Sequence, residues 1–156
     1  MRVVVPLPIT DGSDVAHRVL AAEGVDHEVR MVDGYLGYGE LLAELWSEGG
    51  GLVVVEHDVA PWAGALTQLA DCEADWCQFR YPKDGGALVR GLGCTKFSAR
   101  LMVEYPDLPS AWLGTAWQGL DGAVGTAVGE ALRAEQPERF PLCRHDPPVA
   151  HARRLQ

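Results

Sequence analysis

The segment LVVVEHD, residues 52–58, joins four consecutive apolar residues to two carboxylates. A short run that is apolar at every position is typical of a strand covered on both faces, as in the parallel sheets of α/β proteins. Glu56 and Asp58 follow two positions apart, so an extended backbone places both carboxylates on the same side. We therefore expect a central strand over residues 52–55, with both carboxylates in an open cleft at its carboxyl end.

Strand and helix patterns alternate on the amino-terminal side of this segment. Residues 2–8 (RVVVPLP) and 28–32 (EVRMV) are predicted strands, while residues 15–20 and 40–46 carry helical patterns. This alternation is typical of an α/β fold with a mostly parallel sheet flanked by helices.

The remaining sequence is less regular. Its expected elements are helices over residues 63–69, 98–104 and 120–133, a strand over residues 76–81 and a glycine-rich loop over residues 83–93. No repeat, low-complexity tract or linker divides the chain, so the sequence predicts one domain of minimal size over residues 1–156, with a short tail at residues 152–156.

Composition restricts the possible partners. The 156 residues are 47% apolar and 22% charged, with a net charge of −9. This charge argues against binding to a nucleic-acid backbone or an anionic membrane, because phosphates are bound by surplus Lys and Arg. A phosphorylated ligand stays possible if a bound cation neutralises its charge. No apolar run approaches the roughly 20 residues of a membrane span, and residues 1–8 do not form a signal peptide, so a cytoplasmic location is expected.

The four cysteines, at positions 72, 77, 94 and 143, lack the two close pairs of a zinc ribbon. In a reducing cytosol we expect them to be buried or half-buried thiols. A metal or disulfide role is the alternative.

Three strand ends are candidate ligand sites, because ligands of open α/β sheets bind beyond the carboxyl ends of the strands. They are residues 6–11, Asp33 with the glycine after it, and the acidic run that contains Glu56 and Asp58. Two carboxylates this close repel each other unless a cation or proton lies between them. Mg²⁺ or Mn²⁺, held by carboxylates and substrate phosphates, is the usual solution. The alternative is that Asp58 caps a helix while Glu56 is simply solvated.

The carboxyl-terminal half offers further candidates. Asp121 begins a predicted helix, where a carboxylate can cap the helix or face a cleft as a general base. His145 and His151 flank a proline pair and are candidate ligands, although a single histidine is more often a surface or core residue. Trp112 and Trp117 are either core residues or part of a pocket that stacks on an acceptor ring.

Taken in order, these segments resemble the inverting family 2 glycosyltransferases of the GT-A fold. The stretches that carry the resemblance are Val3-Val4-Val5-Pro6, Met31-Val32-Asp33-Gly34, Glu56-His57-Asp58 in place of Asp-x-Asp, Gly91-Leu92-Gly93-Cys94, Leu120-Asp121-Gly122, and Pro148-Val149-Ala150-His151. The resemblance implies a nucleotide-binding half over residues 1–82 and an acceptor-side half over residues 83–151.

The same resemblance implies roles for individual residues. Pro6, Asp33 and Glu56 would bind the nucleotide-sugar donor, a UDP- or GDP-sugar. Asp58 and His151 would hold Mn²⁺ or Mg²⁺.

On the acceptor side, the resemblance makes Asp121 the general base that deprotonates an acceptor hydroxyl, with inversion at the anomeric carbon. Two positions differ from the family pattern, since Glu56 replaces an Asp and Leu120 replaces a Glu. The chain is also short, so a second subunit in a homo-oligomer is a possible partner. These differences favour, as an alternative, a catalytically silent nucleotide-binding or assembly module. A third possibility is a metal-dependent hydrolase that uses the same carboxylates and histidines.

Overall fold

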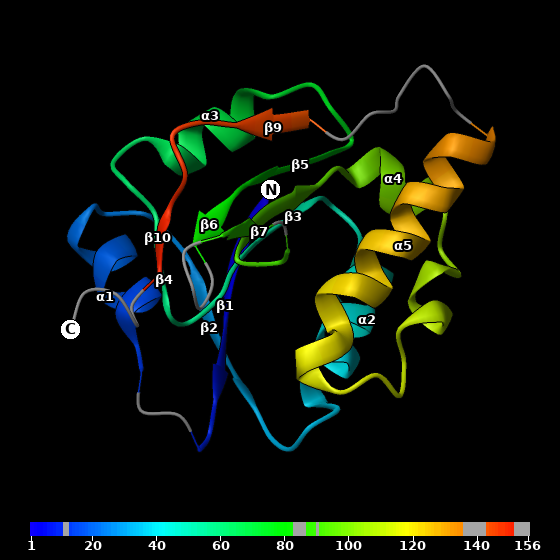
Figure 1. The fold of residues 1–156 in the computed structure, drawn as a ribbon, viewed down its shortest axis with the longest axis horizontal. Helices are drawn as coiled ribbons and strands as arrows, with labels where there is room; N and C mark the ends of the chain where they lie inside the picture. The colour runs from blue at the N-terminus through cyan, green and yellow to red at the C-terminus, as the bar shows by residue number, and fades with distance from the viewer. Residues whose placement is uncertain (11–12, 83–86, 90, 136–142, 152–156) are drawn as a thin grey trace.

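The structure, a computed structural model, describes residues 1–10, 13–82, 87–89, 91–135 and 143–151. Its centre is a six-stranded sheet with the order β2-β1-β3-β8-β5-β9 (Figure 1). In that order the strands are β2 (Glu28–Val32), β1 (Arg2–Pro8), β3 (Leu52–Val55), β8 (Cys94–Phe97), β5 (Trp76–Phe79) and β9 (Cys143–His145). The strands predicted over residues 2–8, 28–32 and 52–55 are confirmed with the same bounds.

The sheet is mixed, where the sequence predicted a mostly parallel one. Strand β1 runs parallel to β2 and β3, and β9 runs parallel to β5, but β8 is antiparallel to both of its neighbours, β3 and β5. The physical reason is the connection from β5 to β8. Its described residues form the short strands β6 (Tyr81–Pro82) and β7 (Leu88–Val89) and no helix, whereas a parallel return needs a crossover that is usually helical.

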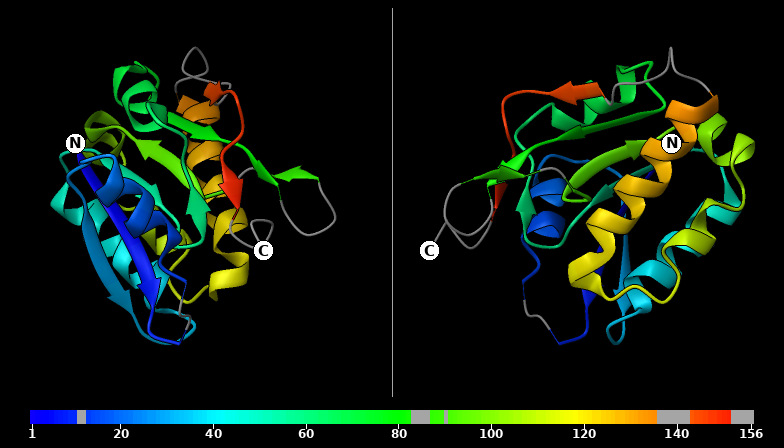
Figure 2. Two further views of the ribbon diagram at one scale, coloured as in Figure 1. Left: turned by 90° about the vertical axis from the view of Figure 1, so that its left-hand side faces the viewer. Right: turned by 45° about the vertical axis from the view of Figure 1, so that its right-hand side comes forward.

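Helices cover both faces of the sheet (Figure 2). They are α1 (Val15–Ala22), α2 (Gly37–Glu48), α3 (Ala65–Asp71), α4 (Ala99–Glu104), the 3-10 helix η1 (Leu108–Ala111) and α5 (Trp117–Glu135). Strand β3 shows the two faces most simply, because Leu52 and Val54 pack with α2 and α5 while Val53 and Val55 pack with α1 and α3. Among the described residues, no helix has the length and hydropathy that a membrane span requires.

A second, two-stranded sheet lies beside the carboxyl end of β3. It pairs β4 (Val59–Ala60) with β10 (Ala150–His151) in antiparallel orientation, with His151 opposite Val59. Figure 1 shows β10, near the end of the described chain, crossing beside β4. This pairing brings the carboxyl-terminal segment to the acidic run.

Helix α5 begins earlier than predicted, at Trp117 rather than at residue 120. The Trp117 amide donates a hydrogen bond to the Tyr35 carbonyl, which fixes the helix start against the end of β2. Asp121 therefore lies inside α5, past its first turn, and the prediction that it begins the helix was wrong.

Candidate functional site

A cleft opens at the carboxyl ends of β1, β2 and β3. It has a volume of about 460 Å³ and is lined by residues 8–10, 32–35 and 56–58, together with Trp117 and Gln118. This volume lies within the range of small-ligand sites. The structure thus brings Asp33, Glu56 and Asp58 together in one cleft, at the sheet edge that the sequence indicated.

The acidic run itself is fixed by backbone hydrogen bonds. The Glu56 amide donates to the Gly93 carbonyl, and the His57 carbonyl accepts from the Ala16 amide at the start of α1. Glu56 and His57 are buried rather than solvated. Asp58 is followed by β4, not by a helix, so it caps no helix and that alternative is wrong.

Asp58 and His151 meet in the structure. His151 Nε2 lies 3.0 Å from Asp58 Oδ2, and the two side chains are 14% and 15% exposed. The contact depends on the β4–β10 pairing, which places His151 opposite the residue that follows Asp58. The Tyr81 ring stacks on the other side of the imidazole, with ring centroids 5.9 Å apart and planes 11° apart. A carboxylate oxygen and an imidazole nitrogen at a cleft edge form a donor pair that suits Mn²⁺, and Mg²⁺ less well.

Asp121 is held in place by two hydrogen bonds. The Leu92 amide donates to Oδ1 over 2.7 Å, and the Tyr81 hydroxyl donates to Oδ2 over 3.1 Å. The loop before β8 needs glycine for this arrangement. A Cβ on Gly91 would lie 2.5 Å from Asp121 Oδ2, and a Cβ on Gly93 would lie 2.6 Å from the Tyr81 ring.

Two buried tyrosines lie among the carboxylates. Burial raises the pKa of Tyr81 far above its usual value, and the charges of Glu56 and Asp121 raise it further. Burial and the same two carboxylates also raise the pKa of Tyr38. Both hydroxyls therefore stay protonated and can donate. The carboxylates of Glu56 and Asp121 act on both tyrosines, and that of Asp58 acts on Tyr81 as well.

Pro6 is the predicted donor-site residue that the structure places away from the cleft. It is buried within β1, opposite Arg30, and the strand continues to Pro8. The Ile9 amide then donates to the Val32 carbonyl, which extends the pairing past the strand end. The lining residues are consequently those at positions 8–10, because the sheet edge lies two residues further along than Pro6.

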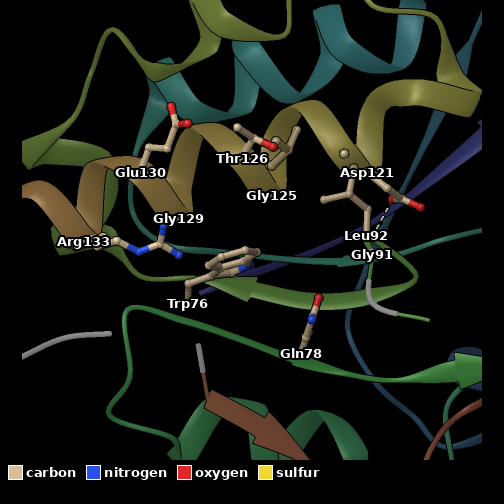
Figure 3. Close-up of a pocket in the computed structure, with 12 residues that line it drawn as sticks. Trp76, Gln78, Gly91, Leu92, Asp121, Gly125, Thr126, Gly129, Glu130 and Arg133 are labelled. Carbon is tan, nitrogen blue, oxygen red and sulfur yellow. Dashed lines mark hydrogen bonds between the residues drawn. The ribbon is translucent and has the colours of Figure 1, made fainter. Parts of the chain in front are cut away.

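A second pocket, of about 420 Å³, lies between α5 and the sheet (Figure 3). Asp121 lies at one end, Trp76 and Gln78 on the sheet side, and Glu130 and Arg133 at the other end. Glycines 122, 125 and 129 of α5 leave room for it. The Trp76 Nε1 and Gln78 Nε2 atoms are buried and have no hydrogen-bond partner in the described part of the chain. Such donors are costly to bury without a partner, so the pocket is suited to a ligand that carries oxygen acceptors.

The other sequence candidates divide between core and cleft. Trp112 is a core residue, fully buried against Trp46. Trp117 lines the cleft and packs against Tyr38 and His57. His145 lies on β9 and is not among the residues that line the cleft.

Sequence reasoning missed Tyr81, Trp76 and Gln78. Trp76 and Gln78 carried one signal, because they share a face of the strand predicted over residues 76–81, and Tyr81 carried none. That signal does not identify which face looks into a pocket.

No protein-family model matches the sequence, and no curated protein matches it either. Two of the solved structures that are similar to this chain are described by name. One is the crystal structure of a glycosyltransferase involved in the glycosylation of the major capsid of PBCV-1, with a TM-score of 0.51 over 97% of this chain and 93% of that one, at 8% identity. The other is the crystal structure of A197 from STIV, with a TM-score of 0.50 over 67% of this chain and 68% of that one, at 14% identity. At such identities the similarity shows the fold alone, which is a mixed α/β fold like that of a glycosyltransferase.

Proposed function

We propose that this protein is a metal-dependent glycosyltransferase of the GT-A type, which moves a sugar from a UDP- or GDP-sugar to an acceptor hydroxyl with inversion. The observation that carries the proposal is the meeting of Asp58 and His151, 3.0 Å apart, at a cleft that Asp33 and Glu56 also line. A carboxylate–imidazole pair brought together by a dedicated strand pairing is difficult to explain by packing alone.

The cleft is the proposed donor site. Asp33 accepts a hydrogen bond from the nucleobase, and residues 8–10 take the role predicted for Pro6. Asp58 and His151 hold Mn²⁺ or Mg²⁺, with Glu56 beside them. When bound, the cation offsets the diphosphate charge and stabilises the leaving nucleoside diphosphate.

The second pocket is the proposed acceptor site, with Asp121 as its general base. Asp121 lines that pocket, and it lies one helical turn from Trp117, which lines the donor cleft. Each Asp121 oxygen accepts one hydrogen bond and retains a further lone pair for a hydroxyl proton. A hydroxyl in this pocket would be deprotonated while it attacks the anomeric carbon in line, which inverts the configuration.

A catalytically silent nucleotide-binding module is the second candidate. The two hydrogen bonds to Asp121 favour it, because they tie the carboxylate to Leu92 and Tyr81 and give it a structural role without any acceptor. In that case the donor cleft would bind nucleotide but no transfer would follow.

Thermal unfolding with UDP or GDP and their sugar conjugates, each with Mn²⁺, Mg²⁺ or EDTA, tests the proposal. We expect stabilisation by one nucleotide series only when the cation is present, and its loss in Asp58→Asn and His151→Ala. Stabilisation that is the same in EDTA, or is absent for every nucleotide, would contradict the donor site. Turnover with a hydroxyl acceptor separates the transferase from the silent module. Release of free sugar without an acceptor would instead indicate a hydrolase.

A further inference from the structure

Two cysteines and a histidine come together beside β5 and β9, at the edge of the main sheet opposite β2. Cys72 ends α3, Cys77 lies in β5, and His145 lies in β9. Their ligand atoms, two sulfurs and one ring nitrogen, all lie within 4.8 Å of one another. Cys77 is buried and the other two are partly buried. None of the three lines the cleft or the second pocket.

We propose that Cys72, Cys77 and His145 bind a zinc ion. In a tetrahedral zinc site with Zn–S bonds of about 2.3 Å and Zn–N bonds of about 2.0–2.1 Å, the ligand atoms are about 3.5–3.8 Å apart. A spread of 4.8 Å or less is within about 1 Å of that geometry. Two thiolates with an imidazole form a soft ligand set that suits Zn²⁺ and not Mg²⁺ or Mn²⁺. The site is thus chemically distinct from the Asp58–His151 pair.

A buried ammonium group lies beside the cluster. Lys96 is 4% exposed, and its ammonium donates a hydrogen bond to the Cys72 carbonyl oxygen. It makes no salt bridge within the described residues, so a further net positive charge beside it would be unfavourable. The thiolates of Cys72 and Cys77, formed as metal binding releases the thiol protons, would cancel the charge of Zn²⁺, so the occupied site would add no net charge beside Lys96.

The zinc ion would join three segments of the chain. It would tie the short edge strand β9 to β5 and to the end of α3. The chain then leads from β9 to β10. On the way, Asp146 pairs with Arg80, and the Val149 amide donates to the Arg80 carbonyl. Because β10 carries His151, the site would hold in place the strand that completes the Asp58 pair.

Cobalt spectroscopy of the full-length reduced protein tests the inference. Co²⁺ bound by thiolates gives near-ultraviolet sulfur-to-metal charge-transfer bands, which carboxylate and imidazole ligands at Asp58 and His151 do not. We expect one equivalent of Co²⁺ to give these bands and one equivalent of Zn²⁺ to remove them. Absence of the bands in the wild-type protein would overturn the proposal.

Variants identify the ligands. Cys72→Ala, Cys77→Ala and His145→Asn should each weaken Zn²⁺ binding by at least about 100-fold, since even the outer partners of metal ligands contribute 10–100-fold. Cys94→Ala is the matched control, because Cys94 is a buried cysteine on β8 outside the cluster, and it should bind Zn²⁺ like the wild type. Equal loss in Cys94→Ala would show that packing, not ligation, causes the effect.

A measurement on the unaltered protein covers variants that fail to fold. The rate of thiol alkylation of Cys72 and Cys77, read by peptide mass spectrometry, should fall at least about tenfold when Zn²⁺ is added and recover with a chelator, because a coordinated thiolate is less available to the reagent. Equal rates with and without Zn²⁺ would also overturn the proposal. None of these readouts involves nucleotide, so failure here leaves the proposed glycosyltransferase untouched.

Discussion

Tyr81 contacts both sides of the candidate site. Its ring stacks on His151 of the proposed cation pair, and its hydroxyl donates to Asp121 of the proposed acceptor pocket. One buried side chain therefore couples the orientation of a metal ligand to that of a base. At the residue scale, substitutions that remove one functional group can separate the role of the ring from the role of the hydroxyl.

Tyr81→Phe removes the hydroxyl and keeps the ring. We expect a loss of about 1 kcal/mol in unfolding free energy, the usual value of one buried hydrogen bond. Sugar transfer should fall because Asp121 loses one of its two donors, while cation-dependent stabilisation by nucleotide should stay near wild type because the stack on His151 remains. Urea unfolding and a transfer assay measure the two effects. Loss of nucleotide binding in this variant would contradict the division of roles.

Asp121→Asn tests the general base. The asparagine oxygen can still accept from the Leu92 amide, so the fold should survive, while basicity is lost and transfer should fall by about a hundredfold or more. The matched variant Asp58→Asn should instead weaken cation-dependent nucleotide binding, measured by thermal shift. Full transfer activity in Asp121→Asn would place the base elsewhere, and a fall in melting temperature alone would support the silent module.

At the scale of elements, two glycines differ in the space that surrounds them. Gly93 precedes β8 and has no room for a side chain, because Tyr81 fills the space. Gly122 lies within α5, and a Cβ there would meet nothing within 4 Å. The loop needs its glycine for close approach, whereas the helix does not need Gly122 for packing.

Gly93→Ala and Gly122→Ala should therefore change stability in opposite directions. We expect Gly93→Ala to lower the unfolding free energy by about 1–3 kcal/mol, because the new methyl group displaces a buried ring. Gly122→Ala should raise it by about 0.5–1 kcal/mol, because alanine loses less conformational freedom in a helix. Thermal unfolding should show both changes as shifts of a few degrees. A Gly93→Ala variant as stable as the wild type would show that the loop can move away from Tyr81.

Arg2 joins three elements at the amino-terminal edge of the sheet, since it pairs with Glu28 of β2 and Glu48 of α2. Its hydrogen bond holds the pKa of Glu28 below the usual value of 4.5. A lowered pKa stabilises the fold above the unfolded-state pKa, and the gain is lost as the pH falls through the folded-state pKa.

Arg2→Met should therefore lower the unfolding free energy at neutral pH, and the difference from wild type should disappear at low pH. We expect less than about 1 kcal/mol at pH 7, because both partners are exposed and water screens the charges. The difference should persist down to about pH 4.5 and then shrink as the pH falls through the folded-state pKa of Glu28. Urea unfolding between pH 3 and pH 7 measures this difference. Arg18→Met is the control and should have a smaller effect, because the pair of Arg18 with Asp14 is more exposed. A difference that grows as the pH falls would contradict the assignment.

At the scale of the whole molecule, the carboxyl-terminal segment completes both the main sheet and the candidate cation pair. Strand β9 adds to the edge of the main sheet, and β10 pairs with β4 beside the acidic run. Residues far apart in the sequence, Asp58 and His151, therefore form one site.

Deletion of residues 143–156 and His151→Ala separate these two contributions. The deletion removes an edge strand and should lower the melting temperature, while His151→Ala leaves both strand pairings intact and should change it little. Both variants should lose the stabilisation by nucleotide that depends on Mn²⁺. A deletion variant that retains it would exclude His151 from the cation site. Differential scanning fluorimetry measures both properties in one experiment.

Local pattern determined the amino-terminal architecture. The apolar run at residues 52–55 and the alternation before it predicted β1, β2 and β3 with their bounds, and the carboxylates at the end of β3 predicted a polar sheet edge. The strand bounds follow from side-chain periodicity, which depends on neighbouring residues in the sequence. The polar sheet edge follows because the carboxyl ends of parallel strands meet at one edge.

Tertiary structure alone decided the rest. The antiparallel β8, the start of α5 at Trp117, the convergence of Cys72 and Cys77 with His145 and the path of β10 to Asp58 all depend on pairings between segments far apart in the sequence. Two-residue strands such as β4 and β10 carry too few residues for a periodic signal, and their register is set by the packing around them. Asp58 and His151 lie more than half the chain apart, so only the folded sheet brings their side chains within 3.0 Å.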